Sequence, residues 1–172
     1  MTSLTRTIKK LTKEGKLAYK INQYDTDGRT PLICSIVSKR NDRTNPTEII
    51  DTLLNAGADV NVADNFNGMT PIHFAAFASE ESLCVALLGK GADVNQCDFR
   101  CVTPLMISCQ KNLVLLTTIL CDRLANLDAV DDNGWTALHH ASYSGYPKIV
   151  KLLLDYGSDR HIKDNKGVFF HM

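Results

Sequence analysis

One short phrase recurs along this chain at a nearly fixed spacing, and it constrains the fold more than any other feature. The phrase opens with a threonine, continues with proline or alanine and then an apolar residue, and starts at Thr30, Thr70, Thr103 and Thr136. The intervals between these threonines are 40, 33 and 33 residues. A period of this length indicates that the chain stacks copies of one structural unit. Stacked units present a long surface and seldom form a catalytic cleft.

The residues around each threonine predict two helices and a tight turn in every unit. A threonine hydroxyl can cap a helix, and a proline at the first helical position lacks only an N–H that would be unpaired there. A second helix carries paired apolar residues, as in residues 149–154, and a glycine such as Gly157 ends it in the left-handed conformation. Each unit then closes on an aspartate and a turn that projects from the helices as a finger. These aspartates are Asp64, Asp98, Asp131 and Asp164.

This pattern resembles the ankyrin repeat over roughly residues 20–172. The resemblance rests on the threonine phrase, the paired leucines, the glycine after the second helix and the Ala-Asp-Val-Asn segments at 58–61 and 92–95. It implies an all-α solenoid of stacked helix-turn-helix units with β-hairpin or finger loops.

The unit boundaries divide the chain into six segments. An N-terminal capping helix and a first partial repeat occupy residues 1–25; repeats follow at 26–64, 65–98, 99–131 and 132–164, and residues 165–172 begin a further repeat. The first full repeat is seven residues longer than the others. We assign six of these residues to a loop at 39–45 and the seventh to the finger at 65–67.

Two departures from the pattern carry expectations of their own. The third repeat is degenerate, because Cys101 replaces the turn glycine and Leu124 replaces the helix-ending glycine. We therefore expect its second helix and the following loop to run differently. The C-terminal segment has two interpretations: the chain is a fragment of a longer array, or it is a short form in which the fourth repeat is the cap. Exposed Phe169 and Phe170 favour truncation or a partner.

Composition and charge exclude several classes of function. The formal net charge of zero predicts no general attraction to nucleic acid or to an acidic membrane, although residues 1–20 carry a charge of +5. No apolar run is long enough to span a bilayer, and the N-terminus lacks the apolar core of a secretion signal. The six cysteines include no CxxC pair and are expected to be small buried thiols. We expect a cytoplasmic or nuclear protein that is a monomer unless its C-terminal end pairs.

The titratable residues give no catalytic or metal-binding constellation. The resemblance implies that His73 and His139 hydrogen-bond to neighbouring backbone. The segment 25–28 begins like a calcium loop but lacks its later ligands, and no other ligand completes a zinc site with Cys97 and Cys101. We predict no enzyme, no metal and no cofactor. Asn61 and Asn95, each within Asp-Val-Asn, resemble asparagines that are hydroxylated in animal ankyrin domains, with a bond across the inter-unit turn as the structural alternative.

The resemblance also selects a surface for a protein partner, made of the finger tips and the exposed ends of the first helices. The candidate contact residues on it are Arg29, Phe66, Met69, Phe77, Phe99, Arg100, Lys111, Asp132, Asn133, Trp135 and Tyr143. Aromatic residues and arginine dominate binding hot spots, and Trp135 is the first candidate for an anchor. We predict a non-enzymatic interaction module, an adaptor or scaffold. The alternative is a short inhibitor that blocks a kinase or a transcription factor by covering its surface.

Overall fold

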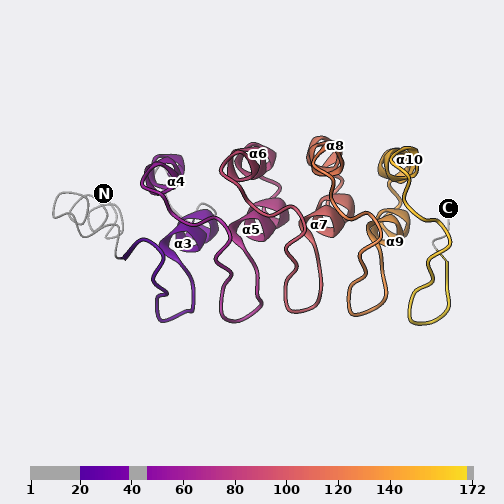
Figure 1. Cartoon of the computed structure of the whole chain (residues 1–172), viewed down its shortest axis with the longest axis horizontal. Helices are drawn as coiled ribbons and strands as arrows, with labels where there is room; N and C mark the ends of the chain where they lie inside the picture. Colours follow the sequence, from indigo (N-terminus) through magenta and orange to yellow (C-terminus); the bar gives the residue numbers. More distant parts are fainter. Residues whose placement is uncertain (1–19, 39–45, 170–172) are drawn as a thin grey trace.

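The helices form two rows, and the loops project from one side of the first row (Figure 1). The computed structural model describes residues 20–38 and 46–169. The first row consists of α3 (Pro31–Ser38), α5 (Pro71–Phe77), α7 (Pro104–Gln110) and α9 (Ala137–Tyr143). The second row consists of α4 (Pro46–Asn55), α6 (Glu81–Gly89), α8 (Val114–Asp122) and α10 (Pro147–Asp155). The described residues contain no β-strand, and none of these helices is long and apolar enough to cross a membrane.

The repeated threonines start the first-row helices as their sequence predicts. The hydroxyl oxygens of Thr103 and Thr136 accept hydrogen bonds from the backbone N–H groups of Met106 and His139, at 3.3 and 3.4 Å. Pro71 and Pro104 each occupy the first position of their helix. The capped start and the short length of these helices fix where each finger leaves its unit.

A continuous apolar interior runs between the two rows. Helix α5 contacts α3 and α7, helix α7 contacts α9, and in the second row α8 contacts α6 and α10. The leucines at one register of the second helices are fully buried: Leu53, Leu87, Leu120 and Leu153. Burial of one such side chain contributes about 1.5–3 kcal/mol to folding, so stability depends on contacts between units. The predicted all-α solenoid is confirmed.

Each finger is a turn held by the aspartate that opens it. The backbone N–H of Asp131 donates to the carbonyl of Trp135 at 3.0 Å, and Asp131 Oδ1 accepts the N–H groups of Asn133 and Trp135. The second finger has one residue more, because the N–H of Asp64 reaches the carbonyl of Met69. The seventh inserted residue therefore lies where the sequence indicates. The capping helix within residues 1–19 and the inserted loop at 39–45 lie outside the described residues.

The third repeat keeps the geometry of its neighbours, so the expectation that it departs is wrong. Helix α8 has nine residues, as α6 and α10 do. Cys101 and Leu124 adopt positive φ angles of 58° and 62°, as the glycines at these positions do in neighbouring units. The left-handed conformation costs a residue with a side chain roughly 1–2 kcal/mol. The repeat therefore retains its shape at a cost in local stability.

Polar side chains also join the units. The carboxylate of Glu81 accepts the backbone N–H of Leu116 at the start of α8, at 3.1 Å. The guanidinium of Arg123 donates to the carbonyl of Leu88 at the end of α6, at 2.8 Å. The first bond satisfies a helix-terminal N–H that has no acceptor within α8, and the second adds to the bond that the Leu88 carbonyl already accepts from the Gly91 N–H.

Candidate protein-binding face

The fingers and the adjoining ends of the first-row helices make one surface, which we call the finger face. Among the predicted contact residues on it, Phe66, Phe99 and Tyr143 are 67%, 68% and 81% exposed. Arg100, Lys111, Asp132 and Asn133 are exposed, whereas Arg29, Met69, Phe77 and Trp135 are half-buried. The rings of Phe66, Phe99 and Tyr143 therefore remain accessible to a partner, whereas Phe77 packs in part against the core.

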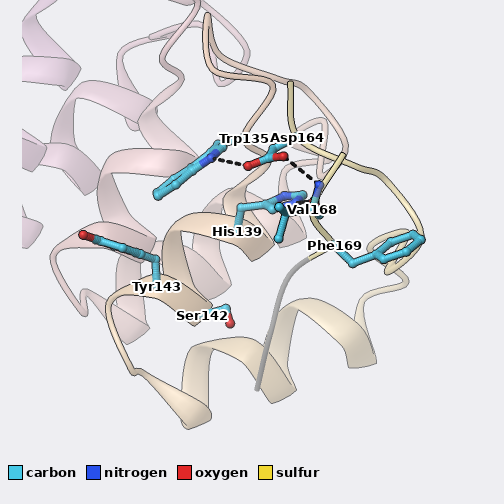
Figure 2. Close-up of a pocket in the computed structure, with 7 residues that line it drawn as sticks. All are labelled: Trp135, His139, Ser142, Tyr143, Asp164, Val168 and Phe169. Atoms are coloured by element: carbon cyan, nitrogen blue, oxygen red, sulfur yellow. Dashed lines mark hydrogen bonds between the residues drawn. The ribbon is translucent and has the colours of Figure 1, made fainter. Parts of the chain in front are cut away.

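Trp135 lies at the centre of an aromatic cluster. Its ring centroid is 5.2 Å from that of His140, edge to face, and 5.1 Å from that of Tyr143. The indole N–H donates to Asp164 Oδ2 in the next finger at 3.3 Å (Figure 2). A ring held on several sides loses little freedom on binding, which favours its use as an anchor.

Six predicted contact residues meet in one hollow of about 270 Å³, which we call the tryptophan hollow. The six are Phe77, Arg100, Asp132, Asn133, Trp135 and Tyr143, and Val102, Gln110, Asp131, His140 and Ser144 complete its lining. The hollow spans the second, third and fourth repeats. The sequence register therefore selects residues that the fold brings together.

A second hollow of about 200 Å³, the arginine hollow, lies toward the first repeat. Its lining consists of Arg29, Ile36, Val37, Phe74, Phe77 and Ala78. The Arg29 guanidinium lies 5.9 Å from the centroid of the Phe74 ring, and Lys111 Nζ lies 5.7 Å from that of Phe77. Phe77 borders both hollows, so they are neighbours along the finger face.

The rings of Phe66 and Phe99 lie on the fingers, outside the two hollows described above. A Cβ on Gly68 would lie 2.5 Å from the Phe99 ring, and a Cβ on Gly28 would lie 3.3 Å from the Phe66 ring. Each ring therefore packs against the glycine of the preceding finger and exposes its remaining surface. These two residues border neither the tryptophan hollow nor the arginine hollow.

A third hollow, of about 230 Å³, lies at the C-terminal end of the finger face (Figure 2). Its lining consists of Trp135, His139, Ser142, Tyr143, Asp164, Val168 and Phe169. The Phe169 ring points away from the other labelled side chains, and Lys163 Nζ lies 4.9 Å from its centroid. The fifth finger forms the same turn as the others, because the Asp164 N–H donates to the carbonyl of Val168 at 2.9 Å.

The carboxylates near Trp135 are engaged within the protein. Asp131 Oδ2 lies 3.1 Å from His140 Nε2, and burial lowers the pKa of His140, although Asp131 opposes this shift. The Val168 N–H holds the pKa of Asp164 below its ordinary value, and Lys166 N–H and the Trp135 indole act in the same direction. These carboxylates stabilise the finger turns. Asp132, the other acidic residue of the tryptophan hollow, makes no side-chain hydrogen bond or ion pair among the described residues.

His73 and His139 have the structural role that the resemblance implies. Nδ1 of His73 accepts the backbone N–H of Thr70 at 3.2 Å, which places the ring proton on Nε2, and Nε2 donates to the carbonyl of Val102 in the next finger at 3.1 Å. His139 makes the corresponding contacts with Thr136 and with Val168.

The remaining candidates for chemistry also belong to the fold. Asp25 Oδ1 accepts the N–H groups of Asp27 and Arg29, as expected of a finger turn, and Oδ2 accepts the Cys34 thiol. Within the described residues no cluster of three or more histidine, cysteine or acidic side chains could hold a metal ion. All six cysteines are free thiols. Three of them are not buried as expected, since Cys34 and Cys97 are half-buried and Cys101 is exposed in its finger turn. Burial raises the pKa of Cys84 and Cys109 to about 12.

Asn61 and Asn95 bridge successive units. Asn61 Nδ2 donates to the carbonyl of Gly91 at 3.0 Å, and its Oδ1 accepts the N–H of Asp93 at 2.8 Å. Asn95 Oδ1 accepts the N–H of Asn126 at 2.7 Å. The cross-turn bond that the sequence suggested as the structural alternative is therefore present at both positions.

The predicted set of contact residues does not include Phe74 and His140, which line the arginine hollow and the tryptophan hollow. Each lies three residues before a predicted contact residue, Phe77 or Tyr143, and residues at this spacing share one face of a helix. Applying helical periodicity to the two predicted rings would have identified both.

Comparison with known proteins agrees with this architecture. The family described as ankyrin repeats (3 copies) matches residues 3–98 and 77–164. Human inversin is 34% identical over 145 residues, which are 83% of this chain and 13% of inversin. Human NF-kappa-B inhibitor alpha is 32% identical over 143 residues, 80% of this chain and 44% of that protein. The human transient receptor potential cation channel subfamily A member 1 is 31% identical over 134 residues, 76% of this chain and 11% of the channel.

The chain belongs to the ankyrin-repeat family. Ankyrin repeats generally mediate protein–protein interaction and are generally not enzymes. The chain spans less than half the length of each of these three relatives.

Proposed function

We propose that this protein is a non-enzymatic adaptor or scaffold that binds another protein on its finger face. The observation that carries the proposal is the Trp135 cluster, in which a half-buried indole is fixed by Asp164, His140 and Tyr143 beside a hollow. Preorganised aromatic side chains next to pockets are typical of the centres of protein interfaces. Six unbridged thiols accord with the reducing cytoplasm or nucleus that we propose as its location.

Affinity capture from the native tissue with paired variants tests this proposal. The wild-type protein and the Leu115→Ala variant should retain a common partner, because Leu115 is a 59% exposed apolar residue of α8, in the second row. The Trp135→Ala variant should lose that partner while its circular dichroism spectrum is unchanged. A partner that all three proteins retain equally would refute binding through the finger face.

The second candidate is a blocking inhibitor, favoured by the similarity to a protein whose name describes an inhibitor of NF-κB. Adding the purified protein to a transcription factor of that kind, or to a candidate kinase, separates the two functions. Loss of DNA binding or of kinase activity supports the inhibitor. Binding that leaves the target active supports the adaptor.

We also propose Asn61 and Asn95 as sites of hydroxylation by a separate oxygenase. In that reaction one atom of O₂ is inserted into a C–H bond of the asparagine, and a reducing co-substrate of the oxygenase accepts the other. Both asparagines lie on exposed turns between units. Tandem mass spectrometry of the protein from its native source tests this, since each modified peptide gains the mass of one oxygen atom. Unmodified peptides at both positions would refute it.

A further inference from the structure

The arginine hollow and the tryptophan hollow have the size of single amino-acid side chains. Their volumes are about 200 and 270 Å³. Cavities that hold drug-sized ligands are larger, roughly 300–1,000 Å³, whereas a benzene ring fits a cavity of about 150 Å³. Each hollow therefore suits one leucine-sized or phenylalanine-sized group. Because Phe77 borders both, one extended peptide can reach the two in succession.

Cations without a carboxylate partner surround the boundary between the hollows. In the described part of the protein, the side chains of Arg29, Arg100 and Lys111 make no hydrogen bond or ion pair, and Arg29 Nε is buried without an acceptor. A buried donor without an acceptor is uncommon in a folded protein. The guanidinium of Arg29 and the ammonium of Lys111 lie over aromatic rings, which leaves their N–H groups free to donate. A carboxylate is the acceptor that such groups bind most strongly.

The acidic residues nearby are negatively charged but make no ion pair with these cations among the described residues. Asp131 is bonded to His140 and to finger N–H groups, and Asp25 to finger N–H groups and the Cys34 thiol. Asp132 and Asp27 are the other acids of these fingers. In the described part of the chain no carboxylate oxygen lies within 4.0 Å of a side-chain nitrogen of these three cations, so their N–H groups remain available to an acidic partner.

We propose that the partner segment is an extended acidic peptide in which two large apolar side chains flank a glutamate or aspartate; this inference rests on the proposed function. The apolar side chains occupy the two hollows, and the carboxylate between them pairs with Lys111 and Arg29 or Arg100. Neighbouring first-row helices are about 8–10 Å apart, so the two hollows are roughly 10–20 Å apart. An extended peptide advances about 3.3 Å per residue, and alternate side chains point to one face. Two apolar residues four positions apart with an acid midway satisfy these conditions.

Labelled synthetic peptides test the proposal on the whole 172-residue chain. The probes are Leu-Ser-Glu-Ser-Phe and its reverse, Phe-Ser-Glu-Ser-Leu, each flanked by glycine and serine and measured by fluorescence anisotropy. Matched peptides carry glutamine or lysine in place of glutamate. We expect at least one glutamate peptide to bind about tenfold more tightly than its lysine counterpart, with glutamine intermediate.

Charge variants locate the effect. Arg29→Gln and Lys111→Gln should each weaken binding of the glutamate peptide about threefold or more, whereas Lys151→Gln, at an exposed lysine of α10, should not. Lys111→Glu should reverse the preference and favour the lysine peptide. Circular dichroism confirms that each variant is folded.

Several outcomes overturn the inference. The inference is refuted if the glutamate and lysine peptides bind with equal affinity. It is also refuted if Arg29→Gln and Lys111→Gln leave the preference for glutamate intact, or if neither glutamate peptide binds at a concentration of about 1 mM. Lysine peptides that bind and depend on Trp135 would refute the acidic segment while leaving the finger face as the binding surface. The affinity capture with Trp135→Ala tests that surface separately.

Discussion

The indole N–H of Trp135 donates a hydrogen bond to Oδ2 of Asp164, 29 residues later in the sequence and one finger further along the stack. The same carboxylate, through Oδ1, accepts the backbone N–H groups of Lys166 and Val168. One aspartate therefore shapes its own finger and fixes the ring of the preceding one. The Trp135 ring is therefore held in place by the protein itself, before any partner binds.

We expect Trp135→Ala to weaken binding of the captured partner by about 2 kcal/mol or more, because a fixed aromatic anchor next to a hollow is typical of hot spots. Trp135→Phe keeps a ring but loses the bond to Asp164, so it should have a smaller effect. Isothermal titration calorimetry measures both, with Leu115→Ala as the control. Unchanged affinity for a folded Trp135→Ala variant would contradict this role.

Acid should destabilise the fold through His73. Burial lowers the pKa of His73 in the folded protein below its ordinary value of about 6.5, so the unfolded state binds more protons near that pH. The free energy of unfolding should be greatest above pH 6.5 and should fall as the pH drops below it. Burial lowers the pKa of His140 as well, which acts in the same direction.

Urea unfolding between pH 7.5 and about 5 measures this dependence, since the histidine contribution lies in that range. His73→Gln should reduce the slope, whereas His161→Gln, at an exposed histidine, should leave it unchanged. A wild-type slope of zero or of opposite sign would show that His73 does not remain neutral in the folded protein.

Leu124→Gly should raise the free energy of unfolding by about 0.5–1 kcal/mol, because glycine adopts a positive φ without strain. The leucine is 85% exposed and contributes little to the core. The reciprocal change Gly91→Leu, at the matching position of the preceding unit with φ of 91°, should lower it by about 1–2 kcal/mol. Chemical denaturation measures both, and a destabilising Leu124→Gly would mean that this side chain makes contacts that outweigh its strain.

Asn61→Ala should destabilise the stack by about 1–2 kcal/mol, because the side chain makes two hydrogen bonds to the next unit. Among the described residues the side chain of Asn95 makes one such bond, so Asn95→Ala should cost less, about 1 kcal/mol. The two midpoints of urea unfolding, compared with the wild type, give the order. The reverse order would show that these bonds do not set the coupling between units.

Much of the fold follows from local signals in the sequence. The threonine caps, the helix-ending glycines and the turn-opening aspartates act within a few residues of where they stand, so their spacing gives the unit boundaries. The same spacing located the additional residue in the finger at 65–67. The expectation at Leu124 was wrong because the missing glycine suggested a changed backbone. Packing against the neighbouring units preserves the backbone conformation, and Leu124 adopts the strained positive φ.

The candidate site is harder to predict from local sequence signals than the fold is. Register alone gathered the residues of the tryptophan hollow, because equivalent positions in a stack are neighbours in space. It did not show that Phe99 packs on Gly68, or that His140 and Asp131 pair under Trp135. These contacts depend on side-chain conformations across different units, which no local pattern in the sequence encodes.

Hydrogen exchange of the complex with the captured partner tests the central claim most directly. We predict that partner binding slows exchange in the fingers and at the ends of α5, α7 and α9, while α6, α8 and α10 keep the exchange rates of the free protein. Protection confined to the second-row helices, with the fingers unchanged, would contradict the assignment of the finger face as the binding surface.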